Sequence, residues 1–144
     1  MDITEILIPE QAIESVEDGH WIDDIIGAPT LKLKVRGLSS RKVQNYRDNK
    51  FRRVARKDRD AQGNIKAEVL SQITRDTLVE VVLLDWDGIK ENGKPVPYSK
   101  DLARKWLTSR NGDRLVGFVT DAALQVDDLQ NETTEELEKN SLPS

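Results

Sequence analysis

The stretch that decides the fold is IKAEVLSQITRDTLVEVVLLD, residues 65–85, which has the clearest periodicity of the 144-residue chain. Its mainly apolar repeat recurs every three or four residues, the spacing that places side chains on one face of an amphipathic helix. The pattern predicts a long central core helix that ends at Asp85–Gly88, because glycine readily adopts the left-handed conformation found after a helix. The repeat consists of Val69, Ile73, Thr77, Val81 and Leu84, widened by Leu70, Leu78 and Val82.

Two shorter helices are predicted downstream of this one. Asn92-Gly93 is a preferred pair for a tight hairpin turn, and Ser99 is a suitable N-cap for the helix that follows. Asn111-Gly112-Asp113 ends that helix and caps another over residues 114–126. Leu102, Trp106 and Leu107 form the predicted buried side of the first helix, and the apolar residues of the second are Leu115, Phe118, Val119, Ala122 and Leu124.

Upstream, the chain changes to a β pattern. Residues 31–36, LKLKVR, alternate apolar and basic side chains as a half-exposed strand does. Together with His20-Trp21-Ile22 and a turn at Gly27-Ala28-Pro29, they predict a β-hairpin over residues 20–36 with Leu31, Leu33 and Val35 facing the core. After Gly37, Ser39 or Ser40 can cap a basic helix over residues 40–58.

These elements predict a mainly α fold of about four helices with a short N-terminal β-hairpin. Residues 1–19 form an acidic N-terminal segment, residues 20–129 a single helical domain, and residues 130–144 an acidic tail. The tail contains no aromatic residue, so we expect it to be disordered and flexible.

Charge is sorted along the chain into blocks, although the net charge is only −4. Residues 1–30 contain eight acids and no Lys or Arg, whereas residues 31–59 contain twelve bases and two acids. Two interpretations of the basic block stay open. The acidic N-terminal segment folds against it, or it binds nucleic acid or an acidic partner.

The inventory of reactive side chains predicts a protein that is not an enzyme. There is no cysteine, and His20 is the single histidine, so thiolate chemistry and a histidine metal cluster are excluded. No serine lies in a Gly-x-Ser-x-Gly motif. We therefore expect no catalytic residue, no metal and no cofactor. The chain has neither a signal-peptide pattern nor a membrane-length apolar run, and cytoplasmic localisation is expected.

Binding is the remaining class of function, and two kinds of residue are candidates for it. Arginines on the basic helix expose most of their surface, and large aromatic side chains are enriched at binding hot spots. An alternative interpretation of the aromatic residues is that they anchor the core. The candidate partner-binding residues are Arg41, Arg47, Arg52, Arg53, Arg56, Trp86, Tyr98 and Trp106.

One region resembles a known family. DWDGI at residues 85–89 and NGKPVPYS at residues 92–99 follow an apolar helix and precede a short helix and LVGFV at residues 115–119. With LKLKVRGL at residues 31–38, this arrangement resembles the tail assembly chaperones of long-tailed, siphophage-type bacteriophages. The likeness spans about residues 20–128.

The resemblance implies a non-catalytic protein that binds the aggregation-prone tape measure protein and promotes assembly of the tail tube around it. It also implies that the protein acts in the host cytoplasm during infection and is absent from the mature virion. Members of that family commonly make a longer product by ribosomal frameshifting, which could contact the tail tube protein, and Glu138-Lys139-Asn140 is compatible with a slippery codon run. Assembly into homo-oligomers around the client is a further possibility that the resemblance raises.

Two other functions compete with this one. A nucleic-acid-binding regulator would use the basic segment 31–59, but the segment has few aromatic residues for stacking on bases and no phosphate-binding glycine loop, so nucleic acid is not the expected partner. A structural component of the head–tail connection or of the tail would remain in purified virions. A membrane partner is not expected.

Overall fold

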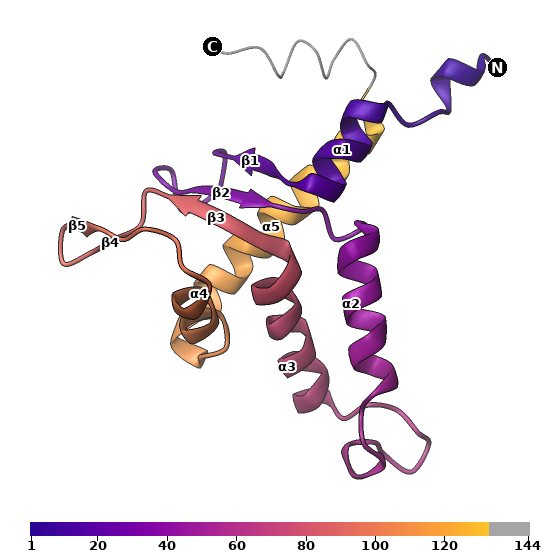
Figure 1. Ribbon diagram of the computed structural model, residues 1–144, viewed down its shortest axis with the longest axis vertical. Helices are drawn as coiled ribbons and strands as arrows, with labels where there is room; N and C mark the ends of the chain where they lie inside the picture. The colour runs from indigo at the N-terminus through magenta and orange to yellow at the C-terminus, as the bar shows by residue number, and fades with distance from the viewer. Residues whose placement is uncertain (133–144) are drawn as a thin grey trace.

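A computed structural model describes residues 1–132 of the chain (Figure 1). Its mainly helical character confirms the predicted class, with five α-helices in this part of the chain and two small antiparallel sheets. The additional helix, α1, lies in the acidic N-terminal segment. The helices are α1 (Glu10–Asp18), α2 (Arg41–Arg52), α3 (Ala67–Thr77), α4 (Lys100–Leu107) and α5 (Asp113–Asp128); the strands are β1 (His20–Ile22), β2 (Lys32–Val35), β3 (Leu83–Asp87), β4 (Lys90–Glu91) and β5 (Lys94–Pro95).

Strand β2 is the centre of the larger sheet, which has the order β1-β2-β3. The pairing of β1 with β2 is antiparallel, with Ile22 opposite Leu33, and confirms the predicted hairpin. Leu33 and Val35 are fully buried and Leu31 is nearly so, as the alternating pattern predicts. The lysines between them, Lys32 and Lys34, lie on the outer face of the sheet.

The prediction of one helix over residues 65–85 is wrong at its C-terminal end. Helix α3 ends at Thr77, a single π-helical turn spans Leu78–Val82, and Leu83–Asp87 is strand β3, which pairs antiparallel with β2. Tertiary structure decides the outcome, because β2 offers an unpaired edge that a strand satisfies and a helix cannot. Periodicity alone cannot distinguish a helix from a strand in a short apolar run. Gly88 accordingly follows a strand, not a helix.

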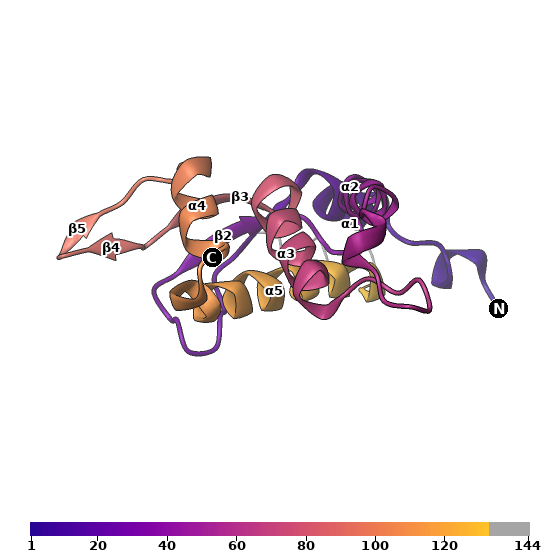
Figure 2. The ribbon, with the colours of Figure 1, turned by 90° about the horizontal axis from the view of Figure 1, so that it is seen from below.

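Helix α5 covers one face of the sheet (Figure 2). Its buried side chains meet those of β2 and of the π-helical turn, and Val16 of α1 joins the same core. The helix confirms the predicted one over residues 114–126. Leu124, one of the apolar residues of this helix, is 48% exposed, because the buried stripe of α5 runs through Ala123 and Val126.

The basic helix is shorter than predicted. Ser40 caps α2 by accepting a hydrogen bond from Lys42 N, as expected, but the helix ends at Arg52 and not at residue 58. Arg59 donates hydrogen bonds to the carbonyl oxygens of Phe51 and Gly63, and this fixes a turn of the chain at the end of α2. A short 3-10 helix at Arg56–Asp58 lies within that turn.

The remaining turn and cap signals are confirmed. Asn92 and Gly93 both have positive φ, 52° and 81°, in the turn between β4 and β5. Ser99 Oγ accepts a hydrogen bond from Leu102 N at the start of α4.

The acidic tail lies almost entirely outside the described residues. Leu129–Asn131 form a short 3-10 helix that continues α5, whereas residues 133–144, with the expected flexible tail and frameshift position at 138–140, are not described. Among residues 1–132, each helix is too short or too polar to cross a lipid bilayer.

Gly88 provides a test of the contact between β3 and the 23–31 loop. Its φ is +85°, and a Cβ placed there would lie 2.1 Å from Thr30 O. Gly63 has a similar φ of +84° and open space around it. We expect Gly63→Ala to cost about 1 kcal/mol of unfolding free energy in urea denaturation, and Gly88→Ala at least about 2 kcal/mol more. Equal losses in the two variants would contradict this close approach.

Candidate partner-binding surfaces

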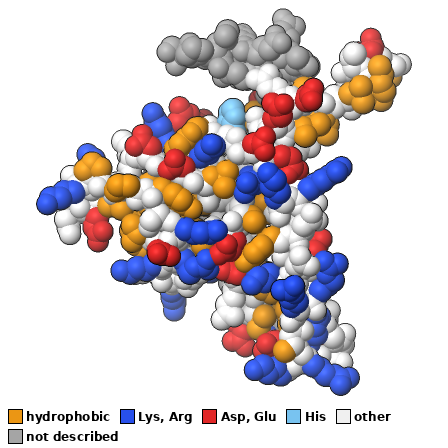
Figure 3. All heavy atoms as spheres, viewed as in Figure 1, with side chains coloured by type: hydrophobic (Ala, Val, Ile, Leu, Met, Phe, Trp, Pro, Cys, Tyr) orange, Lys and Arg blue, Asp and Glu red, His pale blue; other side chains and the backbone are white. Residues whose placement is uncertain are grey.

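Helices α2 and α3 lie side by side and project together from the sheet (Figure 1). We call residues 41–77 the basic arm. Its tip is the connection between the two helices, over residues 53–66. Lys and Arg side chains gather along α2 and at this tip (Figure 3), so the basic block of the sequence becomes one projecting surface.

The candidate arginines at the end of α2 and at the tip of the basic arm have no acidic partner among residues 1–132. Arg53 and Arg56 are exposed and make no salt bridge within residues 1–132, and Arg52 donates only to Asn49 Oδ1, at 2.8 Å. Their full charge therefore faces solvent, which is the property that a surface for an acidic partner requires. Arg59 differs, because its guanidinium is used to hold the turn.

Arg41 and Arg47, the other two candidate arginines, lie nearer the base of the basic arm. Arg41 is exposed at the start of α2. Arg47 is half-buried, with its guanidinium carbon 6.0 Å from the centre of the Phe51 ring and its Nε without a hydrogen-bond partner among the described residues. Arg47 therefore packs on the arm more than it extends from it.

A charged network joins the basic arm to α4. Asp76 accepts hydrogen bonds from Tyr46 Oη (2.9 Å) and from Arg104 (3.0 Å), and Lys50 Nζ lies 3.4 Å from it. Partial burial and the bond to Asp76 raise the pKa of the Tyr46 hydroxyl. Hydrogen bonds from Lys100 and Arg104 lower the pKa of Glu80 in the same network. The hydroxyl of Tyr46 thus helps to hold α2 against α3.

Two carboxylates hold the base of the basic arm. Glu17 accepts hydrogen bonds from Ser40 Oγ (2.9 Å) and Arg41 N (2.8 Å), and Asp127 accepts from Leu38 N and Ser39 N, both at 3.0 Å. Partial burial acts to raise the pKa of Glu17, but the hydrogen bonds from α2 outweigh it and lower the pKa. Part of the acidic N-terminal segment therefore does fold against the basic block, as one of the two interpretations predicts, while the tip stays unpaired.

The three candidate aromatic residues form one cluster. The ring centre of Trp86 lies 4.9 Å from that of Tyr98, edge to face, and 5.3 Å from that of Trp106, stacked. Trp86 is only 4% exposed and donates from Nε1 to Val96 O at 2.7 Å. Trp86 is therefore a core anchor, and Tyr98 and Trp106 are half-buried around it.

Trp106 lines an open groove of about 580 Å³, which we call the Trp106 groove. One wall comes from Gly88–Glu91, within the DWDGI loop and β4, and the other from α5 and the turn before it. The sequence singled out Trp106 and DWDGI, which contains Ile89, but expected Leu31 to face the core and did not join Leu115 and Phe118 to this site. The apolar residues beside Trp106 in the groove are Leu31, Ile89, Leu115 and Phe118, and the cations at the rim are Lys90 and Arg114.

The structure does not bring the candidate arginines and aromatic residues into one site. None of the five arginines lines the Trp106 groove, so the candidates divide between a basic arm and an apolar groove. Across residues 1–132, no three carboxylate or imidazole side chains are grouped as a metal ligand set.

A known family model matches the region that contains the basic arm and most of the Trp106 groove, whereas the groove residues Ala28, Thr30 and Leu31 lie before that region. The model describes the YdaY prophage protein family, and it matches residues 38–140, which is more than half of the chain. The chain belongs to the YdaY prophage protein family. It is therefore a phage-derived protein, and the family region includes the whole basic arm, β3, α4 and α5. No curated protein and no solved structure matches the chain.

Charge reversal at the tip should leave the fold intact. Within residues 1–132, Arg53→Glu with Arg56→Glu removes no ion pair or hydrogen bond of these guanidinium groups, so we expect the free energy of unfolding to change by less than about 0.5 kcal/mol. Arg59→Ala should cost about 1–2 kcal/mol, because two carbonyl oxygens lose a charged donor. Thermal and urea denaturation measure both. A large loss in the Glu variant would show that the tip arginines are structural.

The pKa of Glu17 predicts a pH dependence of stability. Its folded pKa lies below the ordinary 4.5, so its contribution is present above that value and is lost as the pH falls through the folded pKa. Glu17→Gln should lower the free energy of unfolding by about 1–2 kcal/mol at neutral pH and by much less in acid. The matched control is Asp18→Asn, whose exposed pair with Lys42 (3.6 Å) should contribute less than about 0.5 kcal/mol. A loss that is independent of pH would contradict the assignment.

Proposed function

We propose that this phage protein is a non-catalytic tail assembly chaperone that binds the tape measure protein and promotes assembly of the tail tube around it. The observation that carries the proposal is the Trp106 groove. Gly88 and Ile89, the end of the DWDGI segment that resembles tail assembly chaperones, line one wall of that groove, and the helix that contains LVGFV forms the opposite side.

The chemistry of the groove suits an amphipathic helix as its occupant. The apolar side chains of Trp106, Leu115 and Phe118 can cover the hydrophobic face of such a helix, while Lys90 and Arg114 at the rim pair with its acidic residues. Long, aggregation-prone proteins need this kind of cover while they are unassembled. The unpaired arginines of the basic arm would add salt-sensitive attraction for an acidic client.

In this role the protein works in the cytoplasm of the infected host, without a cofactor, and does not remain in the mature virion. A longer product of ribosomal frameshifting would connect it to the tail tube protein. Detection of the chain in purified virions would instead favour a structural component of the head–tail connection or of the tail.

The alternative of a nucleic-acid-binding regulator has one supporting observation, the unpaired cations at the tip of the basic arm. It has few groups for stacking on bases, because the two aromatic residues of α2, Tyr46 and Phe51, are both half-buried and the Tyr46 hydroxyl is bonded to Asp76. Binding to DNA that falls steeply with salt would support it.

Co-expression with the phage's tape measure gene tests the chaperone proposal, with solubility and co-elution as the two readouts. We expect the tape measure protein to become soluble and to co-elute. Asn111→Trp fills the Trp106 groove from an exposed position and should abolish co-elution, whereas Asp121→Trp places the same side chain on an exposed part of α5 outside the groove and should not.

Three outcomes of this experiment are informative. An insoluble, unbound tape measure protein beside a well-folded chain would overturn the chaperone proposal and bring DNA binding forward. Equal co-elution with both tryptophan variants would exclude the groove as the binding surface. Loss of binding only in Arg53→Glu with Arg56→Glu would move the site to the basic arm.

A further inference from the structure

Exposed apolar side chains are concentrated at the N-terminus. Within residues 1–132, ten large apolar side chains are exposed, and six of them lie in the first thirteen residues. Ile6 and Leu7 are 58% and 61% exposed, and Ile3 is 56% exposed. The spacing of these three residues, i, i+3 and i+4, places them on one side of a helical turn. This segment extends outward from the body of the protein (Figures 1 and 2).

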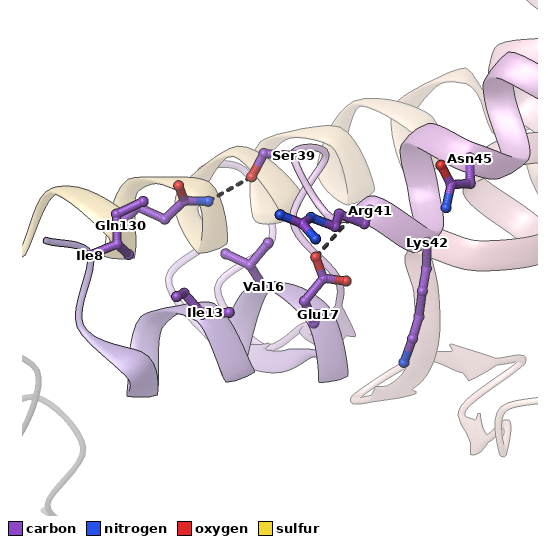
Figure 4. A pocket seen from close by; sticks show the side chains of 9 residues that line it. All are labelled: Ile8, Ile13, Val16, Glu17, Ser39, Arg41, Lys42, Asn45 and Gln130. Atoms are coloured by element: carbon purple, nitrogen blue, oxygen red, sulfur yellow. Dashed lines mark hydrogen bonds between the residues drawn. The ribbon is translucent and has the colours of Figure 1, made fainter.

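An apolar groove of about 600 Å³ lies at the root of this segment (Figure 4), and we call it the α1–α2 groove. Ile8, Ile13 and Val16 form its apolar side, and Arg41, Lys42 and Asn45 of α2 form the other. Gln130 closes one end by donating a hydrogen bond to Ser39 Oγ at 2.7 Å. Residues 1–7 of the same chain do not line the groove, because the chain leaves it at Ile8.

The charges of the groove and of the segment are complementary. The segment carries Asp2 and Glu5, and residues 1–19 contain no Lys or Arg. Arg41 has no salt bridge within residues 1–132, and Lys42 has only an exposed pair with Asp18. The carboxylate of Glu17 in the groove is already satisfied by Ser40 and Arg41 N. An apolar segment with acidic residues therefore fits this groove, and a basic one does not.

We propose that two copies of this chain exchange their N-terminal segments, so that residues 1–7 of each copy occupy the α1–α2 groove of the other. Segment and groove lie at the same end of the molecule, so a two-fold axis makes the exchange reciprocal and closes it as a dimer. Ile6 and Leu7 of each copy then contact Ile13 and Val16 of the other, and Glu5 faces Arg41. The inference does not depend on the proposed chaperone function.

Sedimentation equilibrium of the full chain tests the dimer. We expect a concentration-dependent dimer. Ile6→Ser with Leu7→Ser should raise its dissociation constant at least about tenfold, because the dimer loses four apolar side chains from its interface, two from each chain. The matched control is Ile26→Ser, which changes an isoleucine that is 90% exposed elsewhere and should leave the dimer unchanged. Arg41→Glu with Lys42→Glu should weaken the dimer, and Arg53→Glu with Arg56→Glu should not.

Disulfide trapping locates the contact, since the chain has no cysteine of its own. Mixing Ile6→Cys with Asn45→Cys under mild oxidation should give a cross-linked pair of chains, whereas mixing Ile26→Cys with Asn45→Cys should not. A chain that stays monomeric and forms no such cross-link overturns the proposal. So does an intramolecular disulfide between Leu137→Cys and Asn45→Cys, which would show that the chain's own C-terminal residues fill the groove.

Discussion

Strand β2 carries the constraint on which the other elements depend. It must find backbone partners along both edges while one of its faces is completely buried. Strand β1 satisfies one edge and β3 the other, and α5 covers the buried face. Because β3 continues directly from the π-helical turn after α3, this pairing also fixes where the basic arm leaves the sheet. The position of the arm is therefore a consequence of sheet pairing.

Hydrogen bonds hold the base of the basic arm in place, whereas the arginines at its tip make no salt bridge within residues 1–132. Carboxylates from two distant parts of the chain, Glu17 and Asp127, bind the backbone and side chains at the start of α2. A Cβ on Gly37 would lie 2.2 Å from Asp127 Oδ1, so this approach requires glycine. A network through Asp76 then fixes the arm to α4. A surface supported in this way presents its free cations in a defined arrangement, which lowers the entropy cost of binding.

Local signals in the sequence were sufficient for much of the fold. Caps such as Ser40 and Ser99 and the Asn92-Gly93 turn depend on interactions within a few residues, so they can be read directly from the chain. Strand β3 could not be predicted in this way, because its state is set by pairing with β2 some fifty residues earlier. The same limit applies to the site. The sequence identified Trp106 and the DWDGI loop, but Leu31 and Phe118 meet them only in three dimensions.

The family match begins at Leu38, between β2 and α2, and this boundary has a consequence for any shortened version of the protein. A chain trimmed to the matched region would retain β3 but lose β2, the strand that pairs with it, together with β1. Its backbone donors and acceptors would then face water along a strand that contains Leu83 and Trp86, a template for intermolecular β-sheet growth. Relatives that lack an equivalent of residues 20–37 must therefore shield this edge with a different segment or with a bound partner.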